Sequence, residues 1–441
     1  MTSCYNLQKR QFGFEWLILI GFMLSFCFVM SIFVSADWAG WILAGLIFLV
    51  PVMAKDFRNN KRLFLALFFI ILAHNVASII NAYFFMFTGA DDDAVRFSNA
   101  ARHSDVYFAL FSHFYVYILS LFYKICASRF FGQEISVLFF TMSCVVFIKF
   151  QKLIGIKKYR SISLLLFGLV PSYLIWGSVT LREPLELFFL MLAVYLGLHF
   201  KLVAKKRILY FCLFVFTSLV FGIFHWALAV YVPILIILFF FWPLAISIKN
   251  WFISLFCLFV LILIALYLLP IYANLLPGLL GKFSRNFLQG NLIYYGLDRI
   301  GHFQSFGGSS RTGYFIVVNF VTFLSTIKTI FTIVVNYLFG PFPWRVYGVV
   351  EFLFMLYGWL KIVLLLGVFI SIKLARNEKR SALFLMLIVY FSLAILYALG
   401  TANYGTALRH QMLTDWILFV FGAPIIMSFV SKCYRIVQKN T

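Results

Sequence analysis

The sequence predicts an all-α fold, a polytopic bundle of transmembrane helices. Hydrophobic residues make up 64% of the 441 residues and charged residues only 11%, against roughly 45–50% and about 25% in soluble domains. The chain also contains 58 Phe and 23 Tyr. A soluble fold cannot remove that much apolar surface from water, because only part of a domain fits into its core. The composition therefore excludes soluble, disordered, collagen-like and disulfide-stapled proteins.

Twelve apolar runs have the length expected of helices that cross a bilayer, which needs about 20 residues. They cover residues 14–34, 38–54, 63–87, 135–150, 162–179, 185–200, 208–224, 227–246, 251–269, 347–372, 382–399 and 416–430. Two further runs, 106–123 and 314–338, are ambiguous.

The distribution of basic residues decides between the possible topologies. With twelve spans and a cytoplasmic N-terminus, 23 of the 36 Lys and Arg lie inside, as the positive-inside rule requires. If the two ambiguous runs also crossed, segments 152–160 and 201–207 would face outward. We therefore expect about twelve spans plus two re-entrant or interfacial helices, with both termini in the cytoplasm.

This topology makes residues 1–441 a single integral membrane domain with two large extracytoplasmic loops. The first loop, 88–133, contains an acidic motif, and the second, 270–345, contains a re-entrant helix. Outside the membrane Arg outnumbers Lys by nine to three. Because the Arg fork binds phosphate through two parallel hydrogen bonds, this bias favours an outward-facing site for a phosphorylated ligand. The candidate phosphate ligands are Arg96, Arg182, Arg285, Arg299, Arg311, Arg345 and Arg409. Contacts with lipid headgroups or with outer acids are the alternative explanation.

The acidic motif is Asp91-Asp92-Asp93, directly after the third span. Such carboxylates can accept a proton from a hydroxyl nucleophile or bind a divalent metal such as Mg²⁺ or Mn²⁺. The alternative is structural, with Asp92 or Asp93 capping a helix over residues 94–104. No metal or other cofactor is required by the rest of the sequence.

Several other residues are candidates for supporting roles. Glu183 could orient Arg182 or assist proton transfer, although carboxylates also favour the first turn of a helix. Trp344 could anchor the chain at headgroup depth or stack on a sugar ring. The remaining supporting candidates are His225, His302 and His410. The chain has no HExxH, GxSxG or Walker A pattern in a credible context, which argues against a zinc hydrolase, a serine hydrolase and an ATP-driven pump.

Taken in order along the chain, these motifs resemble a known family. Asp92, Asp93, Ala94, Phe97 and Ala101 look like the acidic motif in the first extracytoplasmic loop of GT-C glycosyltransferases. Three later groups resemble bacterial membrane proteins of polysaccharide assembly, including repeat-unit polymerases. These groups are Pro171 with Trp176 and Leu181-Arg182-Glu183, then Gly340-Pro341-Phe342-Pro343-Trp344, and then Asn403, Gly405-Thr406-Ala407 and Arg409-His410. By its spacing to Phe97, Asp92 matches the family's catalytic position.

The resemblance implies a membrane glycosyltransferase or polysaccharide polymerase in the bacterial inner membrane. Its substrates would be a polyprenyl-phosphate- or polyprenyl-diphosphate-linked sugar and a glycan acceptor, taken at the extracytoplasmic face. Membrane lipids and other polysaccharide-assembly proteins are the expected partners, and nucleic acid is not one. The alternative is a flippase or exporter of lipid-linked oligosaccharides. An exporter should carry cations deep within several spans, whereas Lys361 is the one clear basic residue inside a span.

Overall fold

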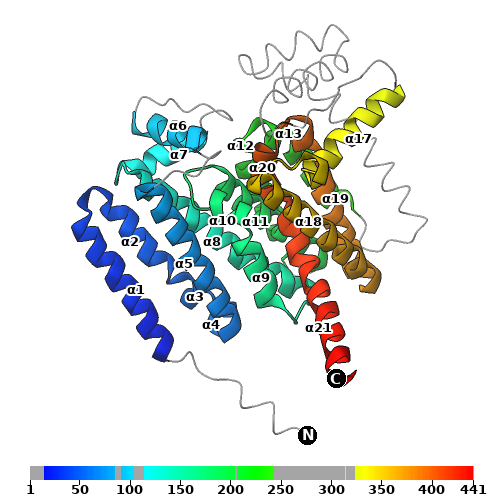
Figure 1. The fold of residues 1–441 in the computed structure, drawn as a ribbon, viewed down its shortest axis with the longest axis horizontal. Helices are drawn as coiled ribbons and strands as arrows, with labels where there is room; N and C mark the ends of the chain where they lie inside the picture. Colours follow the sequence, from blue (N-terminus) through cyan, green and yellow to red (C-terminus); the bar gives the residue numbers. More distant parts are fainter. Residues whose placement is uncertain are drawn as a thin grey trace. The chain divides into compact units, whose positions relative to one another are not determined.

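The computed structural model describes residues 14–84, 91–103, 114–203, 206–242, 313 and 323–440 (Figure 1). Every element in these ranges is a helix, apart from an isolated bridge between Gly313 and Asn403. The all-α prediction is therefore confirmed for the described part of the chain.

Seven described helices are long and apolar enough to cross a membrane, or eight if the last two helices form one bent span. The seven are Glu15–Phe33, Ser35–Met53, Lys61–Tyr83, Arg129–Ile154, Glu183–Leu202, Glu351–Leu374 and Asn377–Leu399. The chain is thus a multi-pass helical protein by these criteria, with fewer spans described than the twelve expected.

One of the expected spans, 162–179, is not a single continuous helix. The chain forms two short helices there, α9 (Arg160–Leu169) and α10 (Pro171–Trp176), separated at Val170. Val170 adopts an extended conformation, with φ −56° and ψ 132°. Proline disfavours helical geometry in the residue before it and has no N–H to continue the hydrogen-bond ladder, so Pro171 ends one helix and begins the next.

The other differences concern lengths and ends. Runs 208–224 and 227–246 contain the shorter helices α12 (Arg207–Ile223) and α13 (Trp226–Phe241), and run 251–269 lies outside the described residues. Of the ambiguous runs, the described parts are α7 (Phe114–Tyr123) and α17 (Phe323–Phe339). At 1.5 Å per residue, α7 covers only about 15 Å, half of a hydrocarbon core.

The chain divides into two compact units. Unit 1 comprises Met1–Leu196, Ile223–Trp226 and Phe419–Thr441, and unit 2 comprises Gly197–Gly222 and Ala227–Leu418. Unit 1 includes α7, α9, α10 and the helices α1 (Phe14–Phe33), α2 (Trp38–Ile47), α3 (Val50–Met53), α4 (Lys55–Arg58), α5 (Lys61–Tyr83), α6 (Asp91–Arg102), α8 (Arg129–Ile154), most of α11 (Glu183–Leu202) and α21 (Ala423–Asn440). Unit 2 includes α12, α13, α17 and the helices α18 (Val349–Leu374), α19 (Asn377–Leu399) and most of α20 (Tyr404–Phe421).

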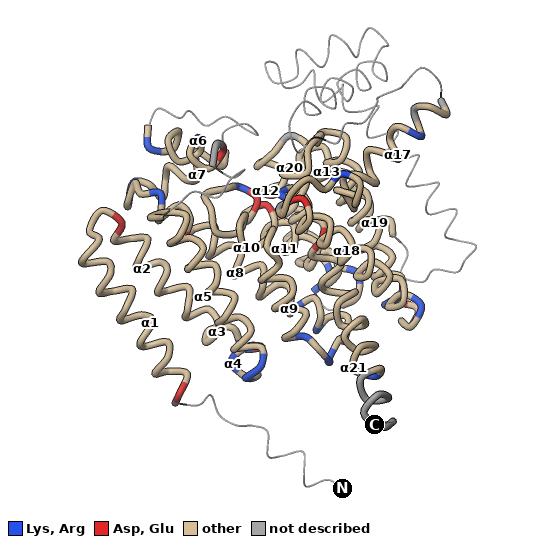
Figure 2. Tube along the Cα trace, viewed as in Figure 1, with Lys and Arg blue, Asp and Glu red and all other residues tan. Residues whose placement is uncertain are grey.

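Helices α5 and α8 run antiparallel and give unit 1 two distinct ends. At one end Arg129 Nη2 donates to Asn81 Oδ1 at 2.7 Å, and at the other Lys152 Nζ pairs with Asp56 Oδ1 at 2.8 Å. Segments 55–62 and 149–160 therefore share one end, as the expected topology of these loops requires. Helix α6 lies at the opposite end, called the α6 end below (Figure 2).

Unit 2 has its helices joined through buried polar contacts. Tyr231 of α13 donates to Val389 O of α19 at 3.2 Å, and Trp242 Nε1 bonds Ser381 Oγ at 3.0 Å. Between α18 and α20, Lys361 and Asp415 form an ion pair of 3.7 Å with both side chains buried. The single helix expected over 416–430 is divided between α20, which already starts at Tyr404, and α21, which begins at Ala423. Asp415 is therefore an interior residue of α20.

Candidate functional site

The acidic motif lies on helix α6, which packs against α7 through one apolar face. Ala94, Ser98 and Ala101 are buried, at the i, i+4 and i+7 spacing of a single helical stripe. The ring of Phe97 meets that of Tyr115 edge to face at 5.2 Å, and Ser98 Oγ lies 2.9 Å from the Tyr123 hydroxyl. Three residues that carried the family resemblance, Ala94, Phe97 and Ala101, thus attach α6 to its neighbour.

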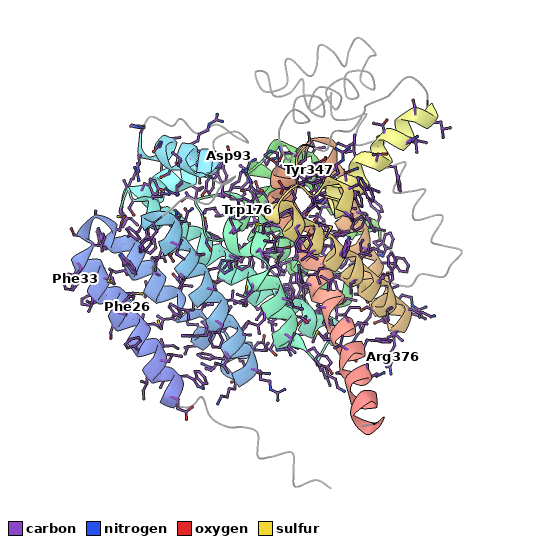
Figure 3. The ribbon with its side chains drawn as sticks, viewed as in Figure 1. Phe26, Phe33, Asp93, Trp176, Tyr347 and Arg376 are labelled. Carbon is purple, nitrogen blue, oxygen red and sulfur yellow. The ribbon has the colours of Figure 1, made fainter. Side chains whose placement is uncertain are left out.

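The three aspartates form the first turn of α6. The helix begins at Asp91 and ends at Arg102, so the expected helix over 94–104 starts too late. Asp92 and Asp93 lie inside the helix and do not precede it as a cap. Carboxylates in this position are favoured by the helix dipole. Asp93 is half-buried (labelled in Figure 3) and Arg96 is exposed, whereas the side chains of Asp91 and Asp92 lie outside the described residues.

Helix α7 connects α6 to the turn that precedes α11. The Tyr123 hydroxyl and Thr180 both approach the backbone of α8 at Gly132. A Cβ on Gly132 would lie 2.5 Å from the Tyr123 hydroxyl oxygen and 3.0 Å from Thr180 Oγ1. One turn along α8, Ser136 Oγ lies 3.5 Å from Leu181 O. The acidic helix thus contacts α7, and the segment before Arg182 contacts α8 at the point where α7 and α8 meet.

A buried histidine, His74, contacts the chain just before the turn that precedes α11. His74 of α5 has Nε2 3.0 Å from Gly168 O and Nδ1 3.0 Å from Ser178 Oγ, and its ring stacks on Phe140. Since a carbonyl only accepts, Nε2 carries the hydrogen, while Nδ1 lies beside the Ser178 hydroxyl, which donates to Leu174 O at 2.7 Å. At Gly177 a Cβ would lie 2.8 Å from the His74 ring, so the close approach requires glycine. His74 therefore ties α9 and residue 178 to α5.

The turn ends in a group of three charged residues. Arg182 Nε lies 3.4 Å from Glu186 Oε1 and 3.8 Å from Glu183 Oε1, and both glutamates are buried at the start of α11. With all three ionised, this group carries a net charge of −1. Arg182, predicted as a phosphate ligand, is thus already flanked by two carboxylates, and Glu183 is placed to orient it.

Tyr115 lies within the electrostatic reach of this group. Burial, and after it the charges of Tyr123 and Glu183, raises the pKa of Tyr115 well above its usual value, whereas Arg182 lowers it. The hydroxyl is therefore neutral under physiological conditions and can both donate and accept a hydrogen bond.

The segment that contains His225 joins the same region of unit 1. Phe224 packs edge to face on Phe114 of α7 at 5.2 Å and stacks on Phe189 of α11 at 5.7 Å. His225 follows directly, between α12 and α13. The α6 end therefore contains five predicted site residues from three separate stretches of sequence, namely Asp93, Arg96, Arg182, Glu183 and His225.

Four other predicted residues belong to unit 2. Arg345 is half-buried at the end of the short helix η2 (Pro343–Arg345), and Trp344 is 72% exposed with its ring stacked on Phe342 at 5.0 Å. Arg409 and His410 lie inside α20, whereas the sequence predicts an outer loop at this position, before the last span.

Their environments differ. Arg409 is buried, while His410 Nδ1 lies 3.1 Å from Thr401 Oγ1 and its ring packs on Tyr397 at 4.5 Å. Those two contacts give His410 a packing role in unit 2.

The remaining predicted site residues, Arg285, Arg299, Arg311 and His302, lie outside the described residues. Within the described part of the chain, no three His, Cys, Asp or Glu side chains are grouped as metal ligands. The oxygen donors of the aspartate motif are of the kind that Mg²⁺ and Mn²⁺ prefer, so the motif fits such an ion chemically.

Sequence reasoning missed four residues that build this region, which are Tyr115, Thr180, Glu186 and His74. Thr180 and Glu186 lie in the turn that the sequence had singled out, but nothing in their spacing distinguished them. Tyr115 and His74 lie within apolar runs, where one polar residue among many Phe and Tyr has no recognisable pattern.

No protein-family model, curated protein or solved structure matches this chain. The chemistry of the α6 end therefore has to be inferred from its geometry. That region offers carboxylates to accept a proton, hydroxyls to bind a polar ligand and arginine to offset negative charge.

Proposed function

We propose that this protein is a GT-C-type or repeat-unit-polymerase-like glycosyltransferase. It would transfer a sugar from a polyprenyl-phosphate or polyprenyl-diphosphate carrier to a glycan acceptor at the extracytoplasmic face of a bacterial inner membrane. One observation carries the proposal: the acidic helix α6 and the Arg182–Glu183 turn meet through α7 and α8, at the end of unit 1 opposite its Lys-rich loops. The multi-pass helical character of the chain suits a lipid-linked substrate.

In the proposed reaction the acceptor hydroxyl attacks the anomeric carbon of the donor sugar. Asp92 takes the hydroxyl proton while the new C–O bond forms. The bond between the anomeric carbon and the phosphate oxygen breaks, and its electron pair leaves with the lipid phosphate. Arg96, the predicted phosphate ligand on the same helix as Asp92, would offset the charge that develops on this leaving group. A divalent ion bound by Asp91, Asp92 and Asp93 would supply further positive charge beside the phosphate.

The exporter alternative is less well supported. Transport of an anionic headgroup needs cationic side chains along a path through the spans. Lys361, the basic residue expected within a span, is paired with Asp415 in the described structure. This pair carries no net charge, so it offers little attraction for a phosphate.

Substitution of the aspartates tests the proposed function. Asp92→Asn keeps the size of the side chain but cannot accept a proton, so glycan output in a deletion strain should fall by ~10²–10⁴-fold at normal protein levels. A metal-binding role predicts a similar loss that raised Mg²⁺ or Mn²⁺ partly restores. Asp91→Asn and Asp93→Asn, made in parallel, test the choice of position.

Asp37→Asn is the matched control, because Asp37 is another carboxylate of unit 1 and accepts a hydrogen bond from Tyr83 at 2.6 Å. It should leave glycan output unchanged. Normal output from all three motif variants would exclude a catalytic role for α6 and favour the exporter.

A further inference from the structure

The α6 end contains buried polar atoms that lack hydrogen-bond partners among the described residues. The Tyr115 hydroxyl and Thr180 Oγ1 are both inaccessible to solvent and make no hydrogen bond of good geometry there; the nearest side-chain partner is Ser136 for Tyr115 and Tyr123 for Thr180. The same holds for Arg182 Nε, despite its proximity to Glu186.

Two more such atoms lie on α10, in the stretch of chain that leads to Thr180. They are Ser172 Oγ and Trp176 Nε1. A buried polar group without a partner costs free energy, so natural proteins rarely retain several in one place unless water or a ligand completes them. The concentration of these atoms in the segment 172–182 and at Tyr115 indicates a bound polar group.

The charges and donor types show what kind of group fits. Arg182 and its two flanking glutamates sum to −1, so a phosphate placed beside them would meet two buried carboxylates. The neutral hydroxyls of Tyr115 and Thr180 both donate and accept, and a carboxylate accepts. A sugar hydroxyl, which also donates and accepts, complements such a set.

We propose that Tyr115, Thr180 and Glu183 form a subsite that binds hydroxyl groups of the glycan and excludes its phosphate. This inference rests on the proposed function and specifies the ligand at the Arg182 turn. It also reassigns Arg182, which orients the carboxylates of the sugar subsite and does not bind phosphate.

The test uses Tyr115→Phe and Thr180→Val, which remove one hydroxyl each at nearly constant volume. Tyr159→Phe is the matched control, since the Tyr159 hydroxyl lies 2.5 Å from Ser431 Oγ and residue 159 belongs to the Lys-rich end of unit 1. Isolated membranes are supplied with the lipid-linked glycan extracted from a strain that lacks this protein. Initial rates of transfer are measured, and the melting temperature of each purified variant is determined in detergent.

The inhibitors distinguish the two parts of the substrate. One is the phosphate-free oligosaccharide released from the same lipid by mild acid, and the other is inorganic pyrophosphate. In Tyr115→Phe and Thr180→Val the inhibition constant of the oligosaccharide should rise by about three- to tenfold, the usual effect of one lost hydrogen bond. The constant for pyrophosphate should not change. Both variants should keep the melting temperature of the parent, whereas Tyr159→Phe should lower it and leave both constants unchanged.

Three results would overturn the subsite. Unchanged oligosaccharide inhibition in both variants would mean that the hydroxyls bind buried water only. A rise confined to pyrophosphate would assign phosphate to this position. A loss of melting temperature equal to that of Tyr159→Phe, without a change in inhibition, would make the hydroxyls structural. If parent membranes show no transfer at all, the proposed function fails and the subsite with it.

Discussion

Replacement of Lys361 by methionine tests the buried ion pair of unit 2. Lys361 Nζ lies 3.7 Å from Asp415 Oδ2 and donates a 2.7 Å hydrogen bond to Gln411 Oε1. Asp415 Oδ2 also accepts from the Tyr357 hydroxyl at 2.8 Å. Methionine keeps most of the volume of lysine but removes its charge. Asp415 would then remain buried without its cation, or would have to take up a proton.

The expected cost follows from this geometry. Two unit charges 3.7 Å apart attract each other by about 4–5 kcal/mol at an effective dielectric constant of ~20. Removal of one partner from a buried pair typically costs about 3–5 kcal/mol, because the other charge stays behind. We therefore expect Lys361→Met to lower the free energy of unfolding by about 3–5 kcal/mol. The double variant Lys361→Met/Asp415→Asn should lie within about 1–2 kcal/mol of the parent, since no unpaired charge is left.

The assay is equilibrium unfolding in mixed detergent micelles, followed by the fluorescence of the ten tryptophans. Lys373→Met is the control, because Lys373 lies near the end of the same helix with its side chain exposed. It should change the free energy of unfolding by less than about 0.5 kcal/mol. The reasoning is refuted if the double variant is no more stable than Lys361→Met, because the two side chains would then not be coupled.

Two further predictions concern the α7–α8 junction and the topology. Gly132→Ala should lower the free energy of unfolding by about 1–3 kcal/mol, since its Cβ would lie 2.5 Å from the Tyr123 hydroxyl oxygen. The control Gly21→Ala, whose Cβ would have no atom within 4 Å, should have no such effect. Equal melting temperatures of the two variants would show that α7 moves away from residue 132 without loss of stability. A reporter fused after Gly307 should be extracytoplasmic and one after Arg376 cytoplasmic, and accessibility of segment 152–160 from outside would contradict the expected topology.

The sequence predicted the class of the fold correctly, but it predicted the ends of several helices wrongly. Apolar composition and run length identified the long helices α1, α5, α8, α11, α18 and α19, because burial in a membrane requires about 20 apolar residues whatever their partners are. The same reasoning failed for 162–179, because hydropathy averages over Pro171. It also placed α20 too late, since polar residues such as Arg409 and Asp415 lowered the apolar signal of a helix whose polar side chains are buried.

The candidate site was predicted in part. The aspartates and Arg182–Glu183 stood out as polar groups in an apolar chain, and in unit 1 the elements that carry them meet at one end. Glu186 and Thr180 did not stand out, because their importance depends on Arg182 and on a hydroxyl of α7, more than fifty residues earlier.

By itself, then, the sequence determined that the chain is helical, lies in a membrane and carries its Lys-rich segments apart from its acidic motif. These properties depend on composition and on the linear order of charges, which are written along the chain. Tertiary structure alone decided that Arg182 is flanked by carboxylates, that Lys361 finds Asp415 and that Tyr115 faces the Arg182 turn. Each of these depends on a contact between segments distant in sequence or on the direction of a side chain within a turn, and neither hydropathy nor charge order contains that information.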